Sequence, residues 1–290
     1  MKKVNSAAGV SASGRKRIFF CDFDGTLANQ ERNISPRTRK ALDAFVARGN
    51  IFVLSSGRAM SDVKNLAKRL DLGYPEMYLS AWNGGEIYSC DTGKTFFRET
   101  LSYDVVREVM QMAHDNGLYC QTYDGDDIVI PGMGKEATYY TTFVKMPVRI
   151  EEAVRSDPAS VLCAEPCKCL VIHLENQEDH ALEAFSAKVG ERFGDTVRTV
   201  LSNPWYLEVD PIRATKANAL IWLCGHLGID VADSVAAGDA PNDNSMIEAA
   251  GLGIGMCNGL PANPEMTAIA DIITEADNNH DGLVPILDIL

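Results

Sequence analysis

The residues with the clearest chemical potential are Asp22 and Asp24, which are followed at once by Gly25 and Thr26. Paired carboxylates can hold a hard cation through oxygen, and they leave one acid as a nucleophile and its neighbour as a general acid or base. A bare Asp-x-Asp turn is more often a solvated loop. Here the apolar run 18–21 predicts a buried strand directly before the acids, and ligands of open α/β sheets bind at such strand ends. We therefore interpret this loop as a candidate active-site loop.

A second group of acids follows another predicted strand near the C-terminus. The short apolar stretch 234–237 runs into a loop that contains Asp239, Asn242 and Asp243. If this strand lies beside the first, Asp239 faces Asp22, and the two loops together supply the oxygen ligands that Mg²⁺ prefers. Asp243 could instead serve only as the N-cap of the following helix.

Two further segments offer partners for an anion. The strand predicted at 51–54 runs into Ser55, Ser56 and Gly57, and such a turn can present a hydroxyl and a backbone N–H to a phosphoryl oxygen. Lys216 stands at the start of a predicted helix, where the helix dipole favours acids over bases. Each signal is weak alone, because Ser-Ser-Gly is common loop chemistry and a lysine at a helix start is usually solvated.

The elements that must position these residues alternate between strands and helices. The first part of the chain links apolar strands to amphipathic helices by short turns, which is typical of a doubly wound parallel sheet. The middle part mixes hairpins with helices, which indicates an inserted α+β domain with an antiparallel sheet. We therefore predict an α/β fold with a loose tail at 1–15, a core at 16–86 and 205–290, and an α+β cap at 87–204. A further strand is expected at 268–273.

Length and charge limit the partners of the chain. With 290 residues and a formal net charge of −13, it lacks the basic surface that nucleic acid or an anionic membrane would need. No apolar run reaches the roughly 18 residues of a membrane-spanning helix, and the first residues lack the apolar centre of a signal peptide. We therefore expect a cytoplasmic monomer or homodimer whose cysteines are reduced. A phosphorylated substrate would need local positive charge from a metal ion or from a few basic side chains.

The motifs taken together resemble the haloacid dehalogenase (HAD) superfamily, and within it the Cof-type phosphatases with a large C2 cap of type IIB. Four motifs occur in the family's order: Asp-Phe-Asp-Gly-Thr-Leu at 22–27, Ser-Gly-Arg at 56–58, Lys216, and Gly-Asp-Ala-Pro-Asn-Asp at 238–243. Asn-Gly-Gly at 83–85 resembles a further element near the first hinge. The resemblance implies a Rossmann-like core with an inserted cap. The second motif carries Ser56 where many relatives have Thr, and this difference retains the hydroxyl group.

The resemblance also implies an activity and a role for each motif. The enzyme would be a Mg²⁺-dependent phosphatase that hydrolyses small phosphate monoesters, such as sugar phosphates or related metabolites, through an aspartyl-phosphate. Asp22 would be the nucleophile, and Asp24 would protonate the leaving group and then activate water. The residues implied in catalysis are Asp22, Asp24, Ser56 and Lys216. Those implied in phosphate binding are Asp22, Gly25, Ser56, Gly57, Lys216 and Asn242. The implied metal ligands are Asp22, Asp24 through its backbone carbonyl, Asp239, and Asp243 through metal-bound water.

The substrate and two other classes of protein stay open at this point. In the cap, Lys135, Lys145, Arg149 and Lys168 could contact a second anionic group of the substrate, although each could equally be a surface charge. A signalling receiver also combines acids, a hydroxyl and a lysine, but it has no large insert and no second acid like Asp24. An inactive binding protein would not need every charged group to be present. A phosphomutase or phosphotransferase would differ only in the group that accepts the phosphoryl.

Overall fold

The computed structural model describes residues 15–144, 146–175 and 179–290. These residues form two compact units, a core made of 15–97 and 215–290 and a cap made of 98–214. Both boundaries lie later in the chain than residues 86 and 204, where the sequence predicts them. The first boundary lies later because the hairpin of β4 and β5 extends the core sheet. The second lies later because β11 pairs inside the cap sheet.

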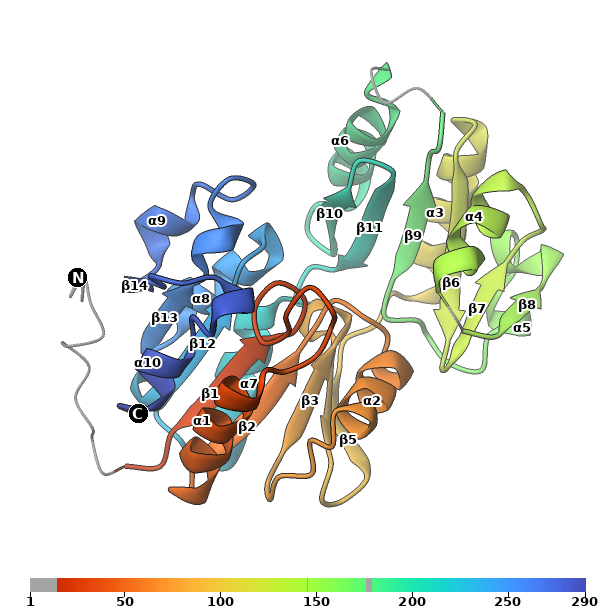
Figure 1. Ribbon diagram of the computed structural model, residues 1–290. Coiled ribbons are helices and arrows are strands. Elements are labelled where there is room, and N and C mark those ends of the chain that lie inside the picture. Colours follow the sequence, from red (N-terminus) through yellow and green to blue (C-terminus); the bar gives the residue numbers. More distant parts are fainter. Residues whose placement is uncertain (1–14, 145, 176–178) are drawn as a thin grey trace. The chain divides into compact units, whose positions relative to one another are not determined.

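The described part of the core contains an eight-stranded sheet with the order β14-β13-β12-β1-β2-β3-β4-β5 (Figure 1). Its strands are β1 (Ile18–Asp22), β2 (Ile51–Ser55), β3 (Tyr78–Ala81), β4 (Glu86–Ser89), β5 (Lys94–Arg98), β12 (Ser234–Gly238), β13 (Leu252–Gly255) and β14 (Ile272–Ile273). Neighbouring strands run parallel from β14 to β3, and β4 then pairs antiparallel with β3. The core helices are α1 (Pro36–Ala47), α2 (Met60–Arg69), α7 (Lys216–Leu227), α8 (Asn244–Ala249), α9 (Met266–Ile269) and α10 (Val284–Leu287).

The central strands β1 and β2 are apolar except for their last residues, because helices cover both faces of the sheet. Every residue of β1 and β2 is buried, as expected for a parallel sheet with two covered faces. On one face Phe20 and Val53 belong to the same hydrophobic cluster as Leu220 of α7. On the opposite face the ring of Phe19 contacts that of Phe45 of α1 at 5.8 Å between centroids. The doubly wound core that the sequence predicts is therefore confirmed.

The described part of the cap contains a six-stranded sheet with the order β10-β11-β9-β6-β7-β8. Its strands are β6 (Tyr119–Asp124), β7 (Asp127–Ile130), β8 (Val148–Ile150), β9 (Cys169–Ile172), β10 (Val197–Asn203) and β11 (Tyr206–Pro211). Its helices are α3 (Tyr103–Asp115), α4 (Lys135–Phe143), α5 (Pro158–Val161) and α6 (Ala181–Phe193). All pairings are antiparallel except that of β7 with β8, and one face packs on a hydrophobic cluster that includes Val109 of α3 and Phe185 of α6. This is the α+β cap that the sequence predicts.

The strand expected at 268–273 forms only in part. Residues Met266–Ile269 form the short helix α9, and only Ile272 and Ile273 pair as β14 with the end of β13. Met266 is fully buried in a cluster with Ile247 of α8, so its contacts favour the helical turn at this point. The prediction is therefore wrong for the first part of this range.

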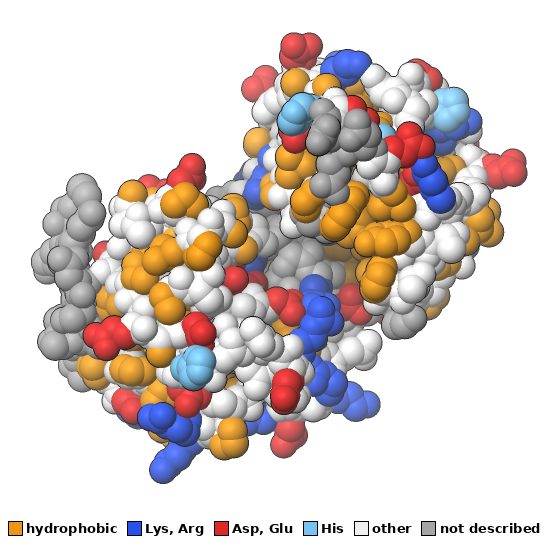
Figure 2. All heavy atoms as spheres, turned by 45° about the horizontal axis from the view of Figure 1, so that its top comes forward, with side chains coloured by type: hydrophobic (Ala, Val, Ile, Leu, Met, Phe, Trp, Pro, Cys, Tyr) orange, Lys and Arg blue, Asp and Glu red, His pale blue; other side chains and the backbone are white. Residues whose placement is uncertain are grey.

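The surface of the cap carries several large hydrophobic side chains. Met133, Phe143 and Ile150 are among the exposed ones. Figure 2 shows hydrophobic side chains gathered on one face of this unit. Among the described residues no helix is both long enough and apolar enough to cross a membrane.

Candidate active site

The site is built at the carboxyl ends of three neighbouring strands of the core. Asp22 is the last residue of β1 and lies in register with Ser55, the last residue of β2. On the other side β1 pairs with β12, whose last residue is Gly238, directly before Asp239. The sequence interpretation required the first acidic loop and the last one to emerge side by side, and this strand pairing confirms that they do.

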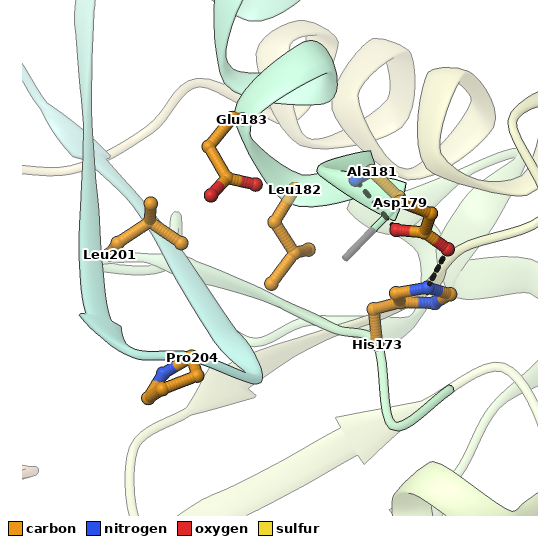
Figure 3. A pocket seen from close by; sticks show the side chains of 7 residues that line it. All are labelled: His173, Asp179, Ala181, Leu182, Glu183, Leu201 and Pro204. Carbon is orange, nitrogen blue, oxygen red and sulfur yellow. Dashed lines mark hydrogen bonds and ion pairs between the residues drawn. The ribbon is translucent and has the colours of Figure 1, made fainter. Parts of the chain in front are cut away.

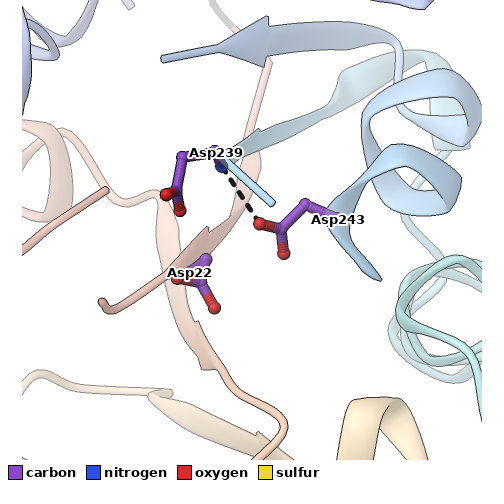
Figure 4. A group of neighbouring side chains, drawn as sticks. All are labelled: Asp22, Asp239 and Asp243. Carbon is purple, nitrogen blue, oxygen red and sulfur yellow. Dashed lines mark hydrogen bonds between the residues drawn. The ribbon is translucent and has the colours of Figure 1, made fainter. Parts of the chain in front are cut away.

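Three carboxylates converge at this edge (Figure 4). Ligand oxygens of Asp22, Asp239 and Asp243 all lie within 4.8 Å of one another. Asp243 is fully buried, and its Oδ2 accepts hydrogen bonds from the backbone N–H groups of Asp239 and Ala240, both at 3.0 Å. Asp243 occupies the N-cap position of α8, but its side chain makes no capping bond there, so it is not merely a helix cap. Asp243 instead folds the loop that presents Asp239.

Lys216 lies between two of these carboxylates. Its side chain has no solvent exposure, and its Nζ donates to Asp22 Oδ1 at 2.6 Å and to Asp243 Oδ1 at 2.5 Å. Thr215 caps α7 by accepting from the N–H of Asn218, which fixes Lys216 as the first residue of the helix. Burial alone would lower the pKa of Lys216, but the two adjacent carboxylates outweigh it and raise the pKa, so the ammonium stays charged.

The site holds more negative than positive charge. Burial raises the pKa of the Asp22 carboxyl well above its usual range, against the opposing effect of Lys216. Burial and the neighbouring Asp243 raise the pKa of Asp239 to about 6, although a hydrogen bond from Thr26 opposes this rise. When all three carboxylates are ionised, Lys216 balances only one of them. A small divalent cation that prefers oxygen ligands fits this donor set and its charge, and Mg²⁺ meets both conditions.

The Gly25–Thr26 turn brings the first loop against the last one. Gly25 has a φ of +80°, and a Cβ at this position would lie 2.3 Å from Asp239 Oδ2, so only glycine fits. Thr26 Oγ1 donates to Asp239 Oδ1 at 3.0 Å, and Asn258 Nδ2 donates to the carbonyl of Gly25 at 2.8 Å. The sequence interpretation gave no role to Thr26 or Asn258. Only the position of Thr26 directly after the acidic pair could have indicated its contact.

The loop after β2 brings the remaining polar groups to the same edge. Ser56 is buried, and its Oγ accepts a hydrogen bond from the N–H of Arg58 at 3.2 Å. Asn242 Nδ2 donates to Asn83 Oδ1 at 3.1 Å, and a Cβ on Gly57 would lie 2.7 Å from the same Asn83 oxygen. The structure therefore brings together Ser56, Gly57 and Asn242 through Asn83, a residue that the sequence interpretation named only as part of a hinge element.

Asp24 occupies a different environment from the three clustered carboxylates. Its side chain is 46% exposed, and its Oδ2 accepts two hydrogen bonds from Arg58, from Nε at 3.0 Å and from Nη2 at 2.6 Å. Its carboxylate does not belong to the group formed by Asp22, Asp239 and Asp243. The expected metal contact of its backbone carbonyl stays a prediction. The ion pair with Arg58 was not foreseen from the sequence, although Arg58 directly follows the Ser-Gly of the second motif.

The cationic side chains proposed in the cap are paired within that unit. Lys135 contacts Glu175, and Arg149 Nη2 lies 2.8 Å from Asp124 Oδ2. The Nζ of Lys168 lies 3.3 Å from Glu208 Oε1, and the Lys168 side chain is almost completely buried. The alternative reading of Lys168 as a surface charge is therefore wrong. Lys145 lies outside the described residues.

The cap also contains a pocket of its own (Figure 3). The described residues that line it are His173, Asp179, Ala181, Leu182, Glu183, Leu201 and Pro204. Asp179 accepts from His173 Nε2 at 2.9 Å and from the N–H of Ala181 at 2.9 Å, which holds the start of α6. This lining includes two acids, no lysine or arginine, and no hydroxyl or thiol. Among its described residues the pocket therefore lacks a fixed cation and a hydroxyl that could hold a phosphoryl group.

A parallel core, an inserted cap and a cluster of carboxylates around a buried lysine define a hydrolase with a HAD-type fold. The sequence model of the family described as "haloacid dehalogenase-like hydrolase" matches residues 19–287, nearly the whole chain. The chain therefore belongs to this family. This confirms the resemblance that the motifs indicated.

Individual relatives align over almost their full lengths. A Streptococcus pyogenes protein named "putative phosphatase" is 29% identical over 91% of this chain and 94% of its own length. The 5-amino-6-(5-phospho-D-ribitylamino)uracil phosphatase of Bacillus subtilis is 28% identical over 92% and 95%. The crystal structure of a haloacid dehalogenase-like hydrolase from Bacteroides thetaiotaomicron superposes with a TM-score of 0.80, at 28% identity, over 94% of this chain and 99% of that one. These similarities span the core and the cap together.

Proposed function

We propose that this protein is a Mg²⁺-dependent phosphatase that hydrolyses small phosphate monoesters through an aspartyl-phosphate on Asp22. The observation that carries the proposal is the contact of Lys216 with both Asp22 and Asp243 at the carboxyl edge of the sheet. A nucleophilic carboxylate, a cation for the phosphoryl oxygens and further acids for a metal meet there in one small volume. Phosphoryl transfer depends mainly on such positioning and charge neutralisation.

The proposed reaction has two steps, both carried by side chains of the core. In the first, an Asp22 oxygen attacks phosphorus, the bond from phosphorus to the ester oxygen breaks, and Asp24 donates a proton to the leaving oxygen. In the second, water attacks phosphorus, Asp24 takes the proton of that water, and the bond to Asp22 breaks to release phosphate. Lys216 and the Ser56 hydroxyl would hold the phosphoryl oxygens during both steps.

The metal ion would be held by Asp22 and Asp239, with Asp243 ordering water bound to it. When bound, Mg²⁺ supplies positive charge that balances the carboxylates and the developing charge on the phosphoryl group. Two features of the chain support this assignment: the charge imbalance around Lys216, and the position of Gly25, where the backbone approaches Asp239 too closely for any side chain.

The substrate we propose is a phosphate ester whose remaining part is neutral and rich in hydroxyl groups, such as a sugar or polyol phosphate. The cap cations Lys135, Arg149 and Lys168 each pair with an acid of the cap, which disfavours a second anionic group on the substrate. The name of the Bacillus subtilis relative specifies a phosphorylated ribityl group, which is a polyol chain. Hydrolysis, rather than transfer to a second substrate, is favoured because the Streptococcus pyogenes and Bacillus subtilis relatives described above both carry phosphatase names.

A phosphate-release assay tests the proposal. The purified full chain would be offered a panel of sugar and polyol monophosphates, matched bisphosphates and an aryl phosphate, with Mg²⁺ or with chelator. We expect turnover that needs Mg²⁺, prefers monophosphates over bisphosphates, and disappears in Asp22→Asn. Turnover that persists in Asp22→Asn would contradict the aspartyl-phosphate, and transfer of phosphate to a sugar in place of release would indicate a phosphomutase.

A further inference from the structure

Arg58 connects two groups to which the proposed function gives separate tasks. Its guanidinium donates twice to Oδ2 of Asp24, and its backbone N–H donates to Oγ of Ser56. Because Ser56 Oγ accepts this bond, its own proton stays available for a phosphoryl oxygen. One residue of the second motif thus fixes the orientation of the phosphate-binding hydroxyl and also contacts the general acid.

The two oxygens of Asp24 are not equivalent. Both hydrogen bonds from the Arg58 guanidinium go to Oδ2, at 3.0 and 2.6 Å. Nε of Arg32 lies 3.8 Å from Oδ1, on a side chain that is 68% exposed. Within the described residues Oδ1 therefore accepts no hydrogen bond. It is the oxygen of Asp24 that remains to exchange a proton.

A short acidic side chain that is nearly half exposed can adopt several rotamers, and proton transfer requires one of them. Two donors of one planar guanidinium on the same oxygen restrict that choice more than a single contact does. The 2.6 Å distance is slightly below the usual range of charge-assisted N–H···O hydrogen bonds. Arg32 adds positive charge nearby without such a contact.

We propose that Arg58 is a positioning residue for Asp24: it holds Oδ2 so that Oδ1 faces the oxygen that leaves phosphorus. The inference rests on the proposed function. In the first step the proton moves from Oδ1 to the leaving oxygen as its bond to phosphorus breaks, and Asp24 becomes a carboxylate. In the second step Oδ1 recovers a proton from the attacking water. Arg58 itself neither gives nor takes a proton.

The test compares substrates that differ in their need for a proton. An alkyl phosphate has a poor leaving group that must be protonated, whereas 4-nitrophenyl phosphate releases a phenolate that leaves without help. General acid catalysis contributes about 10²-fold or more, so Arg58→Met should lower kcat/KM for the alkyl phosphate by about tenfold or more. The loss on the aryl phosphate should stay below about threefold. Arg32→Met, the matched control, removes a nearby charge without a contact and should leave both substrates within about twofold.

A double variant tests whether Arg58 acts through Asp24. In an Asp24→Asn background, Arg58→Met should cause no further loss on the alkyl phosphate, because residues that act as one unit are not additive. If Arg58→Met fails to fold, Arg58→Lys keeps the charge but only one donor group, and the same loss confined to the alkyl substrate is expected.

Several results would overturn the inference. Equal losses on both substrates would mean that Arg58 acts on the phosphoryl group or on the fold, and equal losses in Arg32→Met would mean that charge alone matters. Additive losses in the double variant would show that Arg58 acts independently of Asp24. If the wild-type protein shows no turnover that depends on Asp22, the proposed function and the inference are both refuted. If the wild type shows Asp22-dependent turnover but Arg58→Met has no loss confined to the alkyl phosphate, the inference alone is refuted.

Discussion

Asp239→Asn should make the metal-free core more stable, although it removes a residue that we assign to the metal site. The pKa of Asp239 rises from 3.8 to about 6 in the folded protein, so the fold disfavours the ionised carboxyl. A rise of this size corresponds to up to about 3 kcal/mol. The folded pKa lies above the unfolded one, so the protonated Asp239 carboxyl favours the folded state relative to the ionised one. This contribution to stability is present below pH 3.8 and is lost as the pH rises through about 6.

Asparagine is a suitable replacement because it keeps the shape and the Oδ1 acceptor. The hydrogen bond from Thr26 to that oxygen can therefore remain, and only the charge is removed. We expect the free energy of unfolding of Asp239→Asn in chelator to exceed that of the wild type by up to about 3 kcal/mol near neutral pH. The difference should shrink to less than about 1 kcal/mol near pH 4, because the folded wild-type carboxyl is then almost fully protonated and the pH is close to the unfolded pKa of 3.8.

Urea unfolding followed by tryptophan fluorescence measures this difference. Trp82 and Trp222 lie in the core and Trp205 in the cap, so a Trp205→Phe background restricts the signal to the core. The exposed acid Glu248 of α8 provides a control, and Glu248→Gln should change stability by less than about 0.5 kcal/mol at either pH.

Mg²⁺ should make the wild type more stable to unfolding than Asp239→Asn, the reverse of their order in chelator. A ligand that binds only the folded state stabilises it according to its affinity, and the wild type should bind Mg²⁺ more tightly than Asp239→Asn. An Asp239→Asn protein that is no more stable than the wild type in chelator near neutral pH would refute the idea that uncompensated charge strains this site. Equal stabilisation of both proteins by Mg²⁺ would remove Asp239 from the metal site.

Three further predictions follow from buried groups. Lys216→Met should lower the free energy of unfolding in chelator by about 3–5 kcal/mol, because it leaves Asp22 and Asp243 without their cation; an unchanged urea midpoint would contradict this. Gly25→Ala should weaken Mg²⁺ binding by about tenfold or more, since its Cβ would displace the Asp239 carboxylate; calorimetric titration with Mg²⁺ would measure the loss, and unchanged affinity would contradict it. Lys168→Met should destabilise the cap because it removes the cation that lies 3.3 Å from the buried Glu208 carboxylate, and a second change, E208Q, should recover most of the loss in thermal unfolding; no recovery would mean that the two residues are not coupled.

The core of the site could be predicted because its signals are local and its assembly follows a general rule. Asp22 ends one short apolar strand and Asp239 directly follows another, and the carboxyl ends of parallel strands meet at one edge of a sheet. Lys216 was marked by its unusual place at a helix start. The sequence therefore indicated which residues meet, and the pairing of β1 with β12 confirms that their strands are neighbours.

Contacts between side chains from distant loops could not be predicted in this way. The ion pair of Asp24 with Arg58 depends on how two loops leave their strands, which strand patterns do not encode. Lys168 has the residue type of a surface charge, and its burial depends on partners from other strands, such as Glu208 of β11. The helix at Met266–Ile269 was missed because a short apolar run suits a strand or a helix equally well until its packing partners are known.

The order of strands in the core sheet has a consequence for the newly made chain. β1 lies between β2, its neighbour in sequence, and β12, which is translated only after the whole cap. Until then one edge of β1 has no strand to pair with, and unpaired edges invite aggregation. The six cap strands are contiguous in sequence and can pair with one another during this interval. A chain truncated before Ser234 would carry a complete cap but an open central strand, so we expect such fragments to be insoluble rather than partly active.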